Sequence, residues 1–186
     1  MKISAVLLPA AFLCLATAQA QTPTKTAAPP SPSALALVEA LRLDDVVAQS
    51  SAKGARQART EGLLTAAQFT CVIIPANQWT ADIARHFDRT LTPEELAEAV
   101  KFLDSRTGRK VVVEAMQLQH AAERGDAKPF FEPPTPTERR QFEKFMKTSA
   151  ATKMAKDGSF WKIDAVAEIA KKKVARLLAE CPKAKG

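Results

Sequence analysis

The sequence lacks most of the residue types and motifs on which enzyme active sites and metal centres are built. Its 186 residues include no tyrosine and only two histidines, His86 and His120. Neither histidine has ligand partners at the spacing of a metal site, and Asp82, four residues before His86, forms a common helix-surface pair with it. The Gly-x-Ser-x-Gly, His-Glu-x-x-His, phosphate-loop and dinucleotide-binding motifs are absent. The sequence therefore predicts no catalytic site, no metal and no cofactor, with an enzyme of dispersed active site as an alternative.

Cysteine is also scarce, and its number bears on the compartment. One of the three cysteines, Cys14, lies in an N-terminal apolar segment, which leaves Cys71 and Cys181 in the rest of the chain. A thiol redox site needs a Cys-x-x-Cys pair, or one cysteine of lowered pKa beside a base, and neither is visible. An even pair in an oxidising compartment favours a structural disulfide. Such a bond would close a loop of roughly 110 residues and add about 4 to 5 kcal/mol to stability in the chain-entropy treatment.

The N-terminus has the pattern of a cleavable export signal. Lys2 precedes an apolar run over residues 3–16, and the small-x-small sequence at 18–20 is typical of a cleavage site. The apolar run is short for a membrane anchor. We therefore expect residues 1–20 to be a signal peptide, no membrane-spanning segment after cleavage, and a periplasmic or secreted protein. The four prolines within residues 21–33 predict a disordered tether.

Residues 34–186 follow a helical pattern nearly throughout. Trp79, Ile83 and Phe87 repeat every four residues and predict one apolar helix face, and the segment 159–181 has a similar face. These patterns predict an all-α fold, namely a compact helical bundle formed by a single domain.

Three helices are expected before the helix that carries Trp79. The pattern predicts a helix over 34–43, for which Ser31 is the candidate cap and Pro32 the candidate first position, and a second helix from Asp44 to about Leu63. The segment 69–74 is rich in β-branched residues, but the Thr-x-x-Gln capping box at 65–68 favours a helix that is broken at Pro75.

The bundle is expected to contain a duplicated helix–turn–helix unit. Thr92-Pro93-Glu94-Glu95 predicts a capping box in which Thr92 and Glu95 exchange hydrogen bonds with the backbone and proline takes the first helical position. The same pattern returns 43 residues later, with Thr135 and Glu138 in those roles. Further pairs follow in register: Phe102 and Phe145, Ser105 and Thr148, Gly108 and Ala151, Lys110 and Lys153. We therefore expect two hairpin repeats, at about 92–116 and 135–156, with Gly108 ending the first helix or marking its turn.

The segment 79–116 resembles an uncharacterised family of exported bacterial proteins, catalogued as domain of unknown function twenty fifty-nine. The matching residues are Phe87, Thr92, Glu95, Leu96, Phe102, Ser105, Gly108 and Lys110. Arg106 stands where the family usually has proline, and Thr107 where it more often has a small residue. The resemblance implies a signal peptide and a small all-helical domain. It implies no activity, because the family has no established one.

Two basic clusters are candidates for contact with an anion or a partner. Arg106, Arg109 and Lys110 surround Gly108 and are candidates for an anion-binding turn, although the preferred interpretation is a solvated turn whose cations face the end of the preceding helix. Lys171, Lys172 and Lys173, with Arg176, form the densest run of charge, which fits an acidic surface or only a solvated helix face. The net charge of +7 falls to +6 with removal of Lys2.

These observations favour a non-enzymatic binding or interaction module of the cell envelope. Its expected partner is an envelope protein or an anionic envelope surface. Nucleic acid is disfavoured by export and by the absence of tyrosine. The alternative is a periplasmic chaperone or stress adaptor that uses an apolar groove between the hairpins.

Overall fold

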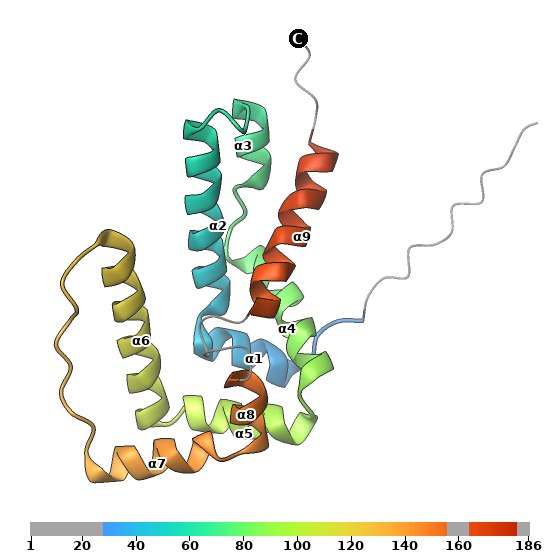
Figure 1. Cartoon of the computed structure of the whole chain (residues 1–186). Coiled ribbons are helices and arrows are strands. Elements are labelled where there is room, and N and C mark those ends of the chain that lie inside the picture. Colours follow the sequence, from blue (N-terminus) through green and yellow to red (C-terminus); the bar gives the residue numbers. More distant parts are fainter. Residues whose placement is uncertain (1–27, 156–163, 182–186) are drawn as a thin grey trace, which may run out of the picture.

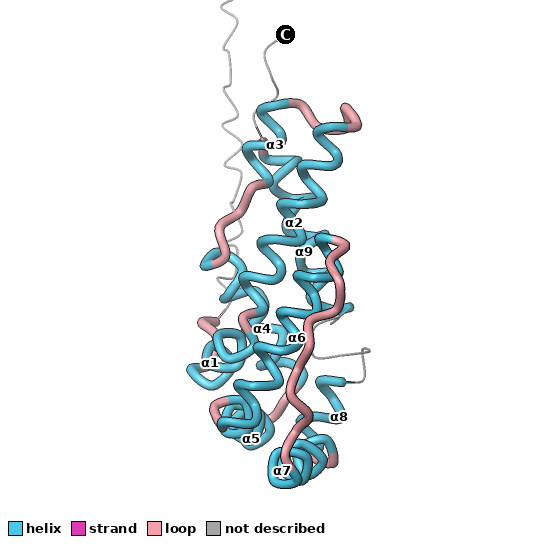
Figure 2. Tube along the Cα trace, turned by 90° about the vertical axis from the view of Figure 1, so that its left-hand side faces the viewer, coloured by secondary structure: helices cyan, strands magenta, loops and turns pink. Residues whose placement is uncertain are grey.

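The computed structural model describes residues 28–155 and 164–181. Within these residues the chain forms α-helices and no strand, which confirms the predicted all-α class (Figures 1 and 2). The helices are α1 (Pro32–Leu41), α2 (Leu43–Thr60), α3 (Ala66–Val72), α4 (Asn77–Thr90), α5 (Pro93–Leu103), α6 (Arg106–Arg124), α7 (Pro136–Met146), α8 (Ser149–Ala155) and α9 (Asp164–Glu180). The predicted signal peptide, most of the predicted tether, and residues 159–163 of the last predicted helix lie outside the described residues.

Helix α1 forms the centre of the core. It packs against α4 and α5, and its apolar face is completely buried. The predicted apolar face of α4 lies against this core, since Trp79 and Ile83 are 0% exposed and Phe87 is 2% exposed. The amphipathic pattern of α4 therefore fixes which side of that helix faces inward and which side is left for solvent.

The start of α1 confirms the predicted cap at Ser31 and the predicted first position at Pro32. The Ser31 hydroxyl accepts the Ala34 N–H at 3.1 Å, and proline suits the first helical turn. Ser31 also donates to the Asp88 carboxylate on α4, through its backbone N–H at 2.8 Å and its hydroxyl at 2.5 Å. The predicted tether is therefore too long at its C-terminal end, where this double hydrogen bond holds the chain against α4.

The first two helices meet at a sharp left-handed turn. Helix α1 ends at Leu41, and Arg42 adopts φ 52°, so the expected end at residue 43 is too late. Helix α2 then ends at Thr60, short of the expected Leu63, before a turn in which Gly62 has φ 75°. Glycine adopts a positive φ without steric cost, so Gly62 allows the chain to turn directly after α2.

Helices α2, α3 and α9 build the end of the molecule opposite to α5, α7 and α8, as both views show (Figures 1 and 2). The expected capping box begins α3, with Thr65 and Gln68 bonded reciprocally at 3.2 and 2.9 Å. Helix α3 ends at Val72, two residues before the expected end, and an extended segment leads through Pro75 to α4. The predicted disulfide is confirmed, because Cys71 and Cys181 are joined with a sulfur–sulfur distance of 2.08 Å. It ties the last turn of α3 to the end of α9.

The duplicated unit consists of the hairpins α5–α6 and α7–α8. Both predicted capping boxes are present: the Thr92 and Thr135 hydroxyls accept the N–H groups of Glu95 and Glu138 at 3.3 and 3.2 Å. The second helix of each hairpin begins at an equivalent cap. The Ser105 hydroxyl accepts the Gly108 N–H at 3.1 Å, and the Thr148 hydroxyl accepts the Ala151 N–H at 3.2 Å.

Gly108 corrects one expectation, because it lies in the first turn of α6 and ends no helix. A Cβ atom built there would lie 2.1 Å from the Phe102 carbonyl oxygen and 2.6 Å from the Leu103 Cα. Glycine is therefore required by the close approach of α6 to the end of α5. The turn between the two helices lies before Gly108, because Ser105 is the residue that caps the start of α6.

We expect Gly108→Ala to lower the free energy of unfolding by about 1 to 3 kcal/mol, because the added methyl group must displace backbone. In an open helix position the same change would stabilise by up to about 1 kcal/mol. Urea denaturation measures the difference. Gly54, inside α2, provides the control: a Cβ atom added there would meet no atom within 4 Å, so Gly54→Ala should not destabilise. Equal effects at both positions would contradict the close approach of α5 and α6.

The two hairpins contact each other reciprocally, as in a two-fold symmetric pair. Lys110 of the first repeat lies 3.4 Å from the cap carboxylate of Glu138, and Lys153 of the second lies 2.7 Å from the cap carboxylate of Glu95. The rings of the equivalent Phe102 and Phe145 stack on each other, with centroids 4.0 Å apart and planes 8° apart. Each repeat therefore supplies the same residues to the other, which is the geometry of an isologous interface formed within one chain.

These reciprocal contacts act on the caps themselves. Hydrogen bonds from Lys153 and Ser149, with that from the Thr92 N–H, lower the pKa of Glu95 to about 2. The Thr135 N–H and the charge of Lys110 likewise lower the pKa of Glu138. Both cap carboxylates are thus held in the charged form that the caps and the ion pairs require, at neutral and at mildly acidic pH.

Candidate functional site

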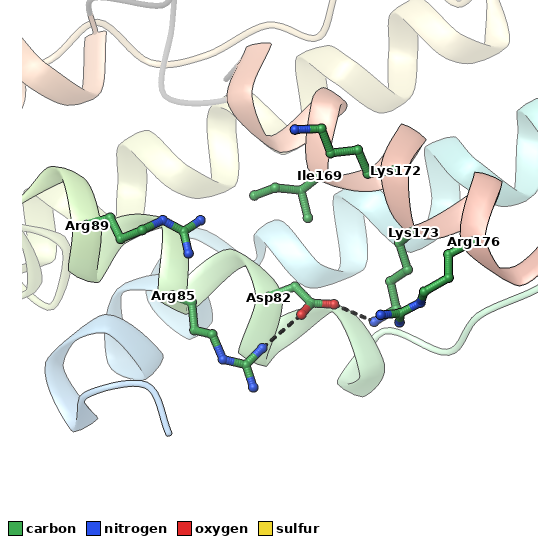
Figure 3. A pocket seen from close by; sticks show the side chains of 7 residues that line it. All are labelled: Asp82, Arg85, Arg89, Ile169, Lys172, Lys173 and Arg176. Carbon is green, nitrogen blue, oxygen red and sulfur yellow. Dashed lines mark hydrogen bonds and ion pairs between the residues drawn. The ribbon is translucent and has the colours of Figure 1, made fainter. Parts of the chain in front are cut away.

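A strongly charged cleft of about 380 Å³ lies between α4 and α9. Figure 3 shows its walls. Seven side chains line this basic cleft: Asp82, Arg85 and Arg89 from α4, and Ile169, Lys172, Lys173 and Arg176 from α9. On α4 the lining residues are spaced by three and four positions, and on α9 both Lys172 and Lys173 lie three or four positions from Ile169 and from Arg176, so each set shares one side of its helix. The outer face of α4, opposite its buried Trp79 and Ile83, thus becomes one wall of the cleft.

Asp82 joins the two walls. Its carboxylate oxygens accept from Arg85 Nη1 at 2.9 Å on the same helix and from Lys173 Nζ at 2.7 Å across the cleft (Figure 3). Lys173 also donates to the Gln78 carbonyl, and its Nζ lies 5.0 Å from the centre of the Trp79 ring. The Lys173 side chain is only 12% exposed. Lys173 therefore serves mainly to dock α9 on α4, through a charge-assisted hydrogen bond and a cation–π contact.

The other cations of the cleft have fewer or weaker contacts within the described part of the protein. Arg89 and Lys172 make no ion pair with any described residue, and both are exposed. Arg176 lies 3.9 Å from Glu180, with both side chains 64% exposed, a distance and exposure at which an ion pair contributes little. Arg85 uses Nη1 for Asp82 and Nε for the Ala28 carbonyl at 3.4 Å, which leaves its second terminal nitrogen for another partner.

The electrostatics of the cleft favour an anion. Five cationic side chains face one carboxylate, so the lining carries a formal charge of +4. A concave surface of one sign concentrates field and raises the local concentration of counter-ions. Among residues 28–155 and 164–181 no group of three potential metal ligands is found. The lining charge therefore makes the cleft attractive to a negatively charged group.

The structure divides the predicted lysine run. Lys172 and Lys173 line the cleft, whereas Lys171 points elsewhere and lies 3.7 Å from Glu168 on the same helix. Arg85 and Arg89 were not identified from the sequence. The available signal was the spacing of Asp82, Arg85 and Arg89, which places them together on the polar side of the predicted α4.

The second predicted basic cluster is not brought to the cleft. Arg109 donates to the Asp104 carbonyl at the end of α5, as expected for a cation that faces a helix C-terminus. Lys110 contacts Glu138 at 3.4 Å and Glu114 at 4.0 Å. Arg106 is exposed. Two of these three side chains thus contribute to the hairpins, while a contact with an external anion remains a prediction.

A different hollow lies between the two hairpins and has a volume of about 290 Å³. Its lining consists of four pairs of equivalent residues, each pair 43 positions apart: Glu98 and Gln141, Lys101 and Lys144, Phe102 and Phe145, Ser105 and Thr148. This inter-hairpin groove therefore lies on the local two-fold relation of the repeats. The stacked phenylalanine rings give it an apolar base, and the two lysines provide charge at its edges.

The comparisons with known proteins find no matching family model, no similar curated protein and no similar solved structure. The resemblance of residues 79–116 to the uncharacterised exported family therefore stays a prediction. None of the helices in the described ranges has the length and apolar character needed to cross a membrane.

Proposed function

We propose that the protein is an exported, non-enzymatic binding module of the cell envelope that holds an anionic ligand or surface in the basic cleft. The single observation that carries this proposal is the charge of the cleft, where five cations on two helices face one carboxylate. The export pattern of residues 1–20 supports a periplasmic location, and the Cys71–Cys181 disulfide fits an oxidising compartment.

The construction of the cleft supports binding more than catalysis. The lining contains arginine, lysine, one carboxylate and one isoleucine, and the carboxylate is bonded to two cations. It therefore offers no group placed to act as a nucleophile or as a general base. What it offers is a fixed array of donors, because both walls are helices and the Asp82–Lys173 bond fixes one to the other.

The test is a matched pair of double variants. We expect Arg89→Gln/Lys172→Gln to weaken binding to anionic phospholipid vesicles on the order of tenfold or more, because each basic residue near an anionic surface contributes about 1 kcal/mol. Co-sedimentation at several salt concentrations measures this, and the difference should shrink at high salt.

The control is Arg106→Gln/Lys171→Gln, which removes the same charge from exposed positions outside the cleft. It should reduce binding only slightly. Equal losses in the two double variants would show that net charge, and not the cleft, determines binding, and would overturn the proposal.

A second candidate function, a chaperone or stress adaptor, is favoured by the inter-hairpin groove. Phe102, which is half-buried and stacks on the buried Phe145, offers apolar surface in this groove to which an unfolded client could bind.

For this candidate we expect the protein to suppress aggregation of an unfolded client, and Glu98→Trp to remove that activity by filling the groove. Glu143→Trp, on the exposed side of α7 and outside the groove lining, should leave it unchanged. Light scattering by the aggregating client measures the suppression in the presence of the wild type and of each variant. A wild-type protein without suppression, or equal suppression by both variants, would remove this function.

A further inference from the structure

We infer that the ligand of the basic cleft carries two phosphate groups, one held by each wall. This inference rests on the proposed function, since it names the chemical class of the anion for the same site. Its basis is the number, the type and the placement of the cations that the internal contacts leave available.

The available cations form two pairs on opposite walls. Arg85 and Arg89 are four residues apart on α4, and Lys172 and Arg176 are four residues apart on α9. Residues at this spacing are neighbours on a helix surface, about 5 to 6 Å apart at Cβ. The Lys172 ammonium and the Arg176 guanidinium point apart in Figure 3, so this pair closes on one anionic group by a change of side-chain rotamers. Lys173 is excluded from this set because Asp82, the Gln78 carbonyl and the Trp79 ring already surround its ammonium group.

The space between the walls separates the two pairs. Ile169 extends from α9 into the cleft between Arg89 and Lys172, and Asp82 lies farther along, bonded to both walls (Figure 3). An anion is repelled by Asp82 and gains nothing from Ile169. A ligand that fills the hollow of about 380 Å³ therefore places its charges towards the two walls and an uncharged part between them.

The type of cation favours phosphate over carboxylate. Three of the four available cations are arginines. The planar guanidinium groups of Arg89 and Arg176 can each donate two parallel hydrogen bonds to a phosphate, and Arg85 adds its second terminal nitrogen. Each phosphate monoester carries about 1.5 to 2 negative charges at neutral pH. Two such groups balance the formal charge of +4 on the lining, whereas two carboxylates leave about half of it uncompensated.

Isothermal titration of the mature, oxidised protein tests the class with defined probes. These are orthophosphate, fructose 1,6-bisphosphate with two spaced phosphates, and benzenetetracarboxylate with a similar charge on carboxylates. We expect the bisphosphate to bind on the order of tenfold or more tightly than either of the others. Arg89→Gln and Arg176→Gln, one from each wall, should each remove most of that advantage while affecting orthophosphate less. Lys171→Gln, outside the lining, should retain it.

The outcomes separate the two proposals. If the tetracarboxylate binds as tightly as the bisphosphate and both depend on Arg89, the cleft binds anions but the phosphate class is wrong. If orthophosphate binds as tightly as the bisphosphate, the arrangement with two phosphate groups is wrong. If no probe and no anionic vesicle binds, the proposed function falls together with this inference.

A lipid headgroup and a soluble metabolite are two sources of the same chemistry. Vesicles containing cardiolipin are compared with phosphatidylglycerol vesicles of equal total charge. Cardiolipin has two phosphodiesters of about one negative charge each, so it tests the two-group arrangement and balances only about half of the lining charge. Preference for cardiolipin, lost in Arg176→Gln and displaced by the soluble bisphosphate, identifies a lipid source at this site. Binding of the bisphosphate without preference between the vesicles identifies a soluble ligand. Preference for cardiolipin that persists in both wall variants contradicts the two-wall arrangement.

Discussion

Replacing Cys71 and Cys181 by serine lowers the free energy of unfolding by about 4 kcal/mol. The disulfide links residues 110 positions apart. Such a bond lowers the entropy of the unfolded chain, and this effect grows with the length of the loop that the bond closes. That value is a large fraction of the 5 to 15 kcal/mol by which domains are typically stable. Urea denaturation of the oxidised protein and of the double serine variant measures it.

The same variant should also weaken anion binding, because α9 carries one wall of the cleft and the disulfide fixes its C-terminal end to α3. Without the bond, α9 is held by its apolar face, which packs against the core through Val166 and Val174, and by the contacts of Lys173 with α4. Reductant provides the control: it should reproduce the loss in the wild type and change nothing further in the serine variant. Unfolding of both proteins at the same urea concentration would show that the bond contributes nothing to stability.

Replacing Phe145 by alanine lowers the free energy of unfolding by about 3 to 5 kcal/mol, as expected for a buried phenylalanine in a packed core. Its ring is 4% exposed and stacks on the equivalent Phe102. Phe102 is only half-buried, so Phe102→Ala should cost less. Thermal or urea denaturation gives both values.

A double-mutant cycle isolates the contact between the repeats. We expect a coupling of about 0.5 to 1.5 kcal/mol between Phe102 and Phe145, the usual value for a close aromatic pair. Phe130→Ala is the matched control, because this ring is 89% exposed and its loss should change stability by less than about 0.5 kcal/mol. If Phe145→Ala costs no more than Phe130→Ala, the two hairpins do not pack as described.

Features that depend on a few neighbouring residues could be predicted from the sequence. The capping boxes at Thr92 and Thr135 are local, since a side chain three residues away completes each. The pairing of Cys71 with Cys181 followed from their number together with the predicted export to an oxidising compartment. The error at Gly108 was of another kind: glycine was interpreted as a helix end, whereas its role is to let the backbone of α5 approach, a distance that no local pattern contains.

The cleft could not be predicted, because it is formed by residues about 90 positions apart. Arg89 and Lys172 share no local pattern, and only the docking of α9 on α4 brings them to one hollow. The lysine run was visible, but successive helical residues point about 100° apart, so one run supplies residues of different roles. Lys173 docks the helix, Lys172 faces the cleft and Lys171 lies outside its lining.

The reciprocal contacts of the hairpins could be predicted only in part. The 43-residue offset was visible, and with it the equivalence of Lys110 and Lys153. That each lysine would contact the cap carboxylate of the other repeat was not visible, because a repeat pattern does not say whether its copies stack in tandem or face each other. The structure shows that they face each other, and this creates the inter-hairpin groove.

The most direct measurement is an NMR titration of the isotope-labelled mature protein with fructose 1,6-bisphosphate, which reports the binding position residue by residue. We predict that the largest backbone and side-chain shifts fall on α4 from Asp82 to Arg89 and on α9 from Ile169 to Arg176, and that they are absent in Arg89→Gln/Lys172→Gln. Shifts confined to residues 106–110 at the first hairpin, or spread over all exposed lysines, would contradict the assignment of the α4–α9 cleft as the anion site.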